Sequence, residues 1–303
     1  MTQPASDDVP AVRDGSTGPR SSATPSGPAA VAAWPAGSAL AAAVAALVVL
    51  GSARSGYAAV LAAVAVLVLA LALTWPHVAG SRTPRATGAV LAVSGLVVVA
   101  GSLSERLRWV AGAAALGILL SFLHQIGRRT GRQGLVVTLL ASFGGLVLTA
   151  SGALLAGLAH ESAGRQLLAV TMVSVVAGVL AELVAGASGV GAARRGRGHR
   201  GRADAPHRAD PPHRADRPAR RAALAGGVAG LALVTALLLR PFLGAVPLWQ
   251  AGALSVLAAL VSWAFRRVVG PAPARLTRGG QLASGIGSVL AVGALPTLVD
   301  LVS

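Results

Sequence analysis

The feature that most constrains the fold of this chain is a series of apolar runs, each about as long as a lipid bilayer is thick. An α-helix needs about 20 apolar residues, within a range of roughly 17 to 25, to cross the hydrocarbon core. We predict about nine such spans, at residues 34–52, 57–75, 86–103, 109–125, 135–158, 167–190, 222–239, 248–265 and 282–302. Eight and ten spans are the alternatives, because the fourth and eighth runs are short and the last contains Pro296 and Asp300. A proline inside a membrane helix frees a backbone carbonyl and can create a hinge.

Composition agrees with a membrane-embedded chain. Hydrophobic residues make up 54% of the sequence and charged residues only 12%, a balance that leaves too little polar surface to cover a water-soluble fold. The 38 glycines would weaken helices in water. In a bilayer each spanning segment must satisfy its own backbone, so helix is retained, and small residues let neighbouring helices approach closely. We therefore predict an all-α, polytopic transmembrane helix bundle.

The distribution of arginine predicts the orientation, because cytoplasmic loops retain positive charge. With nine spans, 21 of the 26 basic residues fall on the side of the N-terminus, including Arg266 and Arg267. The N-terminus is therefore predicted to be cytoplasmic and the C-terminus outside. All the basic residues are arginine, which has GC-rich codons, and this favours a bacterial protein of the plasma (inner) membrane.

Local composition divides the chain into four parts. We predict a disordered cytoplasmic tail at 1–32, a six-span bundle at 33–191, a disordered cytoplasmic linker rich in Arg, Pro and His at 192–221, and a three-span segment at 222–303. An arginine near a membrane surface gains about 1 kcal/mol from anionic headgroups. The linker arginines are therefore candidate contacts with anionic lipids of the inner leaflet: Arg194, Arg195, Arg197, Arg200, Arg202, Arg220 and Arg221. No stacking aromatic residues accompany them, so no specific nucleic-acid partner is expected.

Glu182 is the one carboxylate well inside a predicted span, which makes it a candidate intramembrane polar site, because burying its charge is costly. Gly178 and Gly186 lie four residues to either side, on the same helical face. Two interpretations remain open. A role in proton or ion coupling predicts that Glu182 faces a water-accessible cavity, whereas a structural role predicts that it is sealed in a helix contact.

The sequence contains no signature of a known catalytic site. It has no phosphate-binding loop of the form G-x-x-x-x-G-K-[ST], no H-E-x-x-H, no G-x-S-x-G and no cysteine. We therefore predict no catalytic residue, cofactor or metal. The leading hypothesis is a permease-like transporter or a structural subunit of a membrane assembly, with another membrane protein or a second copy as partner. The alternative is an integral-membrane enzyme that acts on a lipid-linked substrate. It would use either inner arginine clusters that hold phosphates or polar residues of the outer side, such as Arg106, His160, Glu161 and Arg165.

Overall fold

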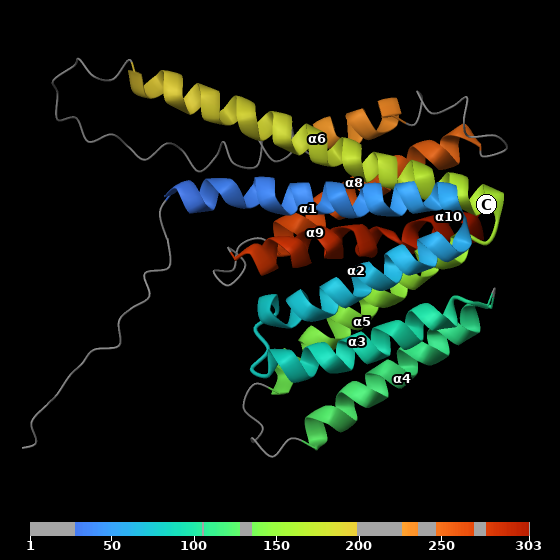
Figure 1. Ribbon diagram of the computed structural model, residues 1–303. Coiled ribbons are helices and arrows are strands. Elements are labelled where there is room, and N and C mark those ends of the chain that lie inside the picture. The colour runs from blue at the N-terminus through green and yellow to red at the C-terminus, as the bar shows by residue number, and fades with distance from the viewer. Residues whose placement is uncertain are drawn as a thin grey trace, which may run out of the picture.

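A computed structural model describes residues 28–104, 106–127, 135–198, 226–235, 247–269 and 277–302, and the side-chain surroundings of 36–104, 106–127, 135–185, 226–235, 247–269 and 277–299. Figure 1 labels most of the helices. They are α1 (Pro28–Ser55), α2 (Tyr57–Val78), α3 (Pro84–Gly101), α4 (Leu107–Ile126), α5 (Leu135–Leu158), α6 (Ser162–Gly198), α8 (Leu248–Val269), α9 (Arg278–Val292) and α10 (Ala294–Val302). Within these ranges every regular element is a helix, which confirms the predicted all-α class.

Eight segments of the described chain are long and apolar enough to cross a membrane. They correspond to the predicted spans one to six, eight and nine, and the fifth has the predicted bounds, Leu135–Leu158. Many large apolar side chains on them remain exposed, among them Leu73, Leu119 and Val147. Exposed apolar faces of this kind are where spanning helices contact lipid. The chain is thus a multi-pass membrane protein.

The predicted seventh span, 222–239, coincides in part with a shorter apolar helix at Gly226–Thr235. Helix α6 and helix α8 run parallel, because Val170 contacts Ala251 and Glu182 pairs with Arg266 further along both helices. The chain between them must therefore connect opposite ends of the bundle. The short helix runs antiparallel to α8, with Val228 near Ala259 and Leu233 near Gly252. This direction favours a ninth crossing, although nine spans and the orientation of the termini stay predictions.

The core lies along α1, α2, α5, α6 and α9, with α4 at one edge of the bundle and α6 at the opposite edge (Figure 1). Its largest fully buried side chains include Leu71, Leu155, Leu168 and Leu290. Helix α1 contributes mainly alanines to this core. A Cβ on Gly285 of α9 would lie 2.5 Å from the Cβ of Ala41, so only glycine permits the close approach of α9 to α1.

The last predicted span is interrupted, so that α9 and α10 are separate helices joined at Gly293. Pro296 has no backbone N–H to donate to the carbonyl of Val292, four residues earlier. At the same break the backbone N–H of Ala294, the first residue of α10, donates to Ser151 Oγ of α5, at 2.8 Å. The proline hinge predicted here thus coincides with a break whose freed N–H is satisfied by a neighbouring helix.

Two predicted boundaries differ from the structure. Helix α6 continues to Gly198, so residues 192–198, which open the predicted linker, are helical. Helix α1 begins at Pro28, so residues 28–32 of the predicted tail are helical too. At the end of α6 small residues run into the polar segment without a helix-stopping proline. At the start of α1, Pro28 occupies the first helical position, where a helix tolerates proline, so composition alone does not mark either helix end. The remainder of the tail and linker, 1–27 and 199–221, lies outside the described residues.

Candidate functional site

Glu182 lies near the end of its span and is buried between helices. It is 20 residues beyond Ser162, where α6 begins, which at about 1.5 Å per residue places it about 30 Å along the helix. Only 7% of Glu182 is exposed. Its two carboxylate oxygens form ion pairs with consecutive residues of α8: Oε2 lies 3.0 Å from Arg266 Nη2, and Oε1 lies 3.4 Å from Arg267 Nη2.

The two arginines differ in their surroundings. Arg266 is 4% exposed, whereas the side chain of Arg267 is 47% exposed and its guanidinium lies 5.7 Å from the centre of the Trp263 ring. Arg267 therefore extends from the buried carboxylate toward the surface, with its charge above an aromatic face. We call Glu182, Arg266 and Arg267 the α6–α8 clamp.

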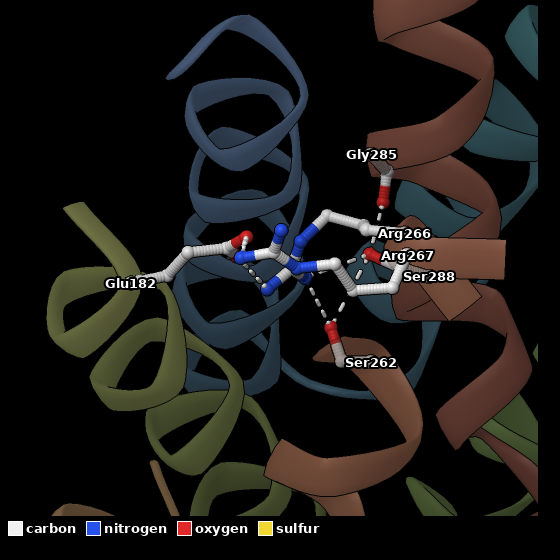
Figure 2. A network of polar contacts seen from close by, with 6 residues as sticks. All are labelled: Glu182, Ser262, Arg266, Arg267, Gly285 and Ser288. Atoms are coloured by element: carbon white, nitrogen blue, oxygen red, sulfur yellow. Dashed lines mark hydrogen bonds and ion pairs between the residues drawn. The ribbon is translucent and has the colours of Figure 1, made fainter. Parts of the chain in front are cut away.

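A chain of hydroxyl groups connects the clamp to α9 (Figure 2). Arg266 Nη1 donates to Ser262 Oγ at 2.6 Å and to Ser288 Oγ at 3.3 Å. Ser262 in turn donates to Ser288 at 3.2 Å, and Ser288 donates to the carbonyl of Gly285 at 2.7 Å. Among the described residues, the Nε–H of Arg266 has no hydrogen-bond partner. The guanidinium therefore joins three helices while leaving one of its donors unsatisfied.

Of the two glycines predicted beside Glu182, the structure describes the surroundings of Gly178 but not those of Gly186. A Cβ on Gly178 would lie 3.3 Å from both Ala259 Cβ and Val228 Cγ1, so this glycine allows α8 and the helix Gly226–Thr235 to pack closely on α6. Gly186 lies within α6, but its surroundings fall outside the described ones. Sequence reasoning placed Glu182 and Gly178 on one face, and in the structure both contact α8.

Sequence reasoning missed the partners of Glu182. It counted Arg266 as a loop residue on the cytoplasmic side, and the structure corrects this, because Arg266 lies within α8 and is buried. Removing it from the count leaves 20 arginines on that side against five. A signal was present in the sequence. Ser255, Ser262 and Arg266 follow at helical spacing, and the apolar pair Val268–Val269 continues the span beyond the arginines.

The predicted lipid-contact arginines cannot be placed around this site. Arg194, Arg195 and Arg197 lie on the last turns of α6, where side-chain surroundings are not among those described. Arg200, Arg202, Arg220 and Arg221 lie outside the described residues. Their contact with anionic lipid stays a prediction.

A second polar group joins three segments at the opposite end of the bundle. Tyr57, at the start of α2, donates to the carbonyl of Ser102 at 2.8 Å. His160, between α5 and α6, has its Nε2 at 3.0 Å from the same carbonyl and stacks on Tyr57 with ring centres 3.8 Å apart. Since a carbonyl oxygen only accepts, His160 Nε2 carries the proton in this contact.

Two hollows contain residues of this group, and a third hollow adjoins them. A recess of about 250 Å³ is lined by Ser102, His160 and Glu161, among others. A hollow of about 490 Å³ is lined by Leu103, Ser104, Arg106, Arg108, Trp109 and His160. A groove of about 570 Å³ between α3 and α4 is lined mainly by apolar residues, and Ser104 lines all three hollows. Of the outer residues named for the enzyme hypothesis, Glu161 and Arg106 thus each line a hollow together with His160. Arg165 instead donates to the carbonyl of Ala159, at 3.2 Å.

Comparison with known proteins adds no further assignment. The chain matches no protein-family model, no curated protein and no solved structure. What can be said of its activity rests on the geometry of these two polar groups.

Proposed function

We propose that the protein is a structural, non-enzymatic subunit of a membrane assembly, in which the α6–α8 clamp fixes α6 where it leaves the membrane. The observation that supports this is the position of the clamp on α6. The helix continues for 16 residues beyond Glu182, to Gly198, which corresponds to about 24 Å of further helix. In Figure 1 this part of α6 slopes away from α1, and its end lies apart from the other labelled helices. A helix held at its point of exit can present its far end to a partner in a fixed direction.

Burial of Glu182 supports the structural interpretation over coupled transport. Transport sites commonly lie near the bilayer midplane, between helix repeats. Glu182 instead lies about 30 Å along a span, which is close to the full thickness of the hydrocarbon core. Both of its oxygens are paired with guanidinium groups. A carboxylate that carries protons across a membrane has to be accessible to water in turn from each side, and this one is sealed.

Specificity of packing, rather than net stability, is the contribution expected of such a clamp. A buried ion pair often stabilises a protein no more than well-packed apolar residues would, because both charges lose their hydration. It does select one alignment of the two helices, since a shift of either one separates the charges. The contact between α6 and α8 otherwise consists of small and apolar residues such as Gly178, Ala259 and Val170, which do not fix an alignment so strictly.

The assembly can be tested by extracting the full chain from its membrane in lipid-polymer discs and measuring the size of the protein component. We expect more than one chain per particle. Glu182→Leu should lower that number while helix content, followed by circular dichroism, stays unchanged. Glu161→Leu removes an exposed carboxylate at the other end of the bundle and serves as the matched control. A wild-type particle with a single chain and no partner would show the proposal to be wrong.

A flux measurement addresses the competing transport hypothesis directly. The protein is reconstituted into liposomes that contain a pH-sensitive dye, and a pH gradient or membrane potential is applied. We expect no proton flux above that of empty liposomes for the wild type or for Glu182→Gln. Flux in the wild type that Glu182→Gln abolishes would instead assign a coupling role to Glu182.

A further inference from the structure

We propose that the end of the bundle opposite the clamp binds one anionic phospholipid, with its phosphate in the arginine hollow and an acyl chain in the α3–α4 groove. The arginine hollow is the one lined by Arg106, Arg108 and His160. The groove is the adjoining hollow between Val97–Leu103 and Trp109–Leu116. This site is independent of the clamp and of the proposed assembly role.

Charge complementarity selects an anionic headgroup. Arg106 and Arg108 are both exposed and lie at the start of α4. Arg106 precedes the helix without a capping hydrogen bond from its side chain, and Arg108 lies with its guanidinium 5.7 Å from the centre of the Trp109 ring. Arginine binds phosphate through several N–H groups at once. The carboxylate of Glu161 lines the neighbouring recess rather than the arginine hollow.

The shape and lining of the adjoining groove select a lipid rather than a free phosphate. Its volume of about 570 Å³ is lined by residues such as Val97, Ala100, Ala113 and Leu116, so it offers little to a soluble anion. Ser104 and Trp109 line both the groove and the arginine hollow, so a charged head and an apolar chain can occupy them together. Trp109 is 56% exposed, and tryptophan prefers the level of lipid headgroups. The occupant is therefore an anionic phospholipid of the leaflet that borders this end.

Gly112 provides a direct means of filling the groove. It lines the groove, and a Cβ placed on it would meet nothing within 4 Å. Gly112→Leu should therefore occupy the space of the acyl chain without a clash within the protein. Gly51 of α1 is equally open, with nothing within 4 Å of its Cβ position, and does not line the groove. Gly51→Leu is the matched control.

In the test, the full chain in a neutral detergent is titrated with brominated phosphatidylglycerol, and quenching of tryptophan fluorescence is followed. The contribution of Trp109 is the part of the fluorescence signal that is lost in the Trp109→Phe variant. We expect saturable quenching by this lipid and about 25-fold weaker binding of brominated phosphatidylcholine, since each of the two arginines contributes about fivefold through the anionic charge. Arg106→Gln with Arg108→Gln should weaken binding by about 25-fold on the same basis. Gly112→Leu should weaken it at least tenfold, roughly the value of the apolar contact that it displaces. Gly51→Leu should change nothing.

Three outcomes would overturn the proposal. Equal quenching by the two lipids would show that charge is not recognised. Unchanged binding in Gly112→Leu would show that the groove holds no chain. Complete competition by millimolar glycerol phosphate would show that the site takes a soluble anion.

Discussion

We predict how strongly the contact between α6 and α8 depends on the charges of the α6–α8 clamp. We consider Glu182→Leu, Arg266→Met and the two changes together. Charges about 4 Å apart attract by about 4 kcal/mol at an effective dielectric constant of 20. Removing one partner of a buried pair leaves the other charge uncompensated and costs about 3–5 kcal/mol. Glu182→Leu, which leaves Arg266 buried without a carboxylate, should therefore lower the free energy of unfolding by about this amount. Arg266→Met should lower it by less, because Arg267 still pairs with Glu182 at 3.4 Å.

The double variant should be far less affected than Glu182→Leu alone. Replacing both charges by apolar residues of similar volume removes the cost of burying them, and such replacements are often neutral or stabilising. Ser262 and Ser288 keep each other as hydrogen-bond partners, at 3.2 Å, when Arg266 is gone. We therefore expect Glu182→Leu with Arg266→Met to lie within about 1 kcal/mol of the wild type. The corresponding coupling energy is about 3 kcal/mol or more in favour of the pair.

Unfolding by sodium dodecyl sulfate in mixed micelles, followed by circular dichroism, measures these differences. Glu161→Leu is the control for loss of a carboxylate, and because Glu161 is exposed it should shift the free energy by no more than about 0.5 kcal/mol. The reasoning is refuted if the effects of the two single substitutions simply add in the double variant. That result would mean that Glu182 and Arg266 stabilise the fold through separate contacts and that their separation of 3.0 Å has no energetic consequence.

Three further outcomes are expected. A Cβ on Gly178 would lie 3.3 Å from atoms of Ala259 and Val228, so Gly178→Leu should destabilise the bundle by about 1–3 kcal/mol in the same assay. A Cβ on Gly230 would meet nothing within 4 Å, so Gly230→Leu should not destabilise it. His160→Ala removes a hydrogen bond and the stack on Tyr57 and should cost about 1–2 kcal/mol; a change below 0.5 kcal/mol would show that the contact is incidental. Because the chain has no cysteine, the single substitutions Arg82→Cys and Ser162→Cys can report topology. An impermeant maleimide applied to intact cells should label the Ser162→Cys variant and not the Arg82→Cys variant. Labelling of the Arg82→Cys variant alone would reverse the predicted orientation.

The sequence predicted the helical segments well, because lipid imposes a simple rule on them. A run of apolar residues of the right length has to be a helix, and the fifth span therefore coincides with α5 at Leu135–Leu158. Helix ends were less accurate where no proline or glycine turn marks them, as at the end of α6. The break at Gly293 shows the opposite case, since Pro296 gave a local signal for it.

The partners of Glu182 were not predictable from the same rule. The sequence marked the residue, because a carboxylate in a span is rare, but it did not indicate which of 26 arginines would pair with it. That choice depends on the parallel packing of α6 and α8, 84 residues apart along the chain at the point of contact. The assumption that arginines at the end of an apolar run belong to a loop concealed Arg266. Similarly, Tyr57 and His160 were each assigned to span ends or loops, and only the fold brings both to the carbonyl of Ser102.

The positions of these contacts follow from what lipid does not provide. In a bilayer apolar surface gains little by leaving lipid for protein, so helices associate through close packing and a few polar contacts. Several buried hydroxyl groups in the described spans, such as those of Thr149, Thr171 and Ser174, donate to the carbonyl of their own helix four residues earlier. They are satisfied without specifying a neighbour. The contacts that do specify one lie mainly near the ends of helices, at the clamp and at the Ser102 carbonyl. Helices whose surfaces consist mainly of alanine, valine and glycine can thus be fixed in one alignment by polar contacts near both ends of the bundle, while the middle of each span stays mostly apolar.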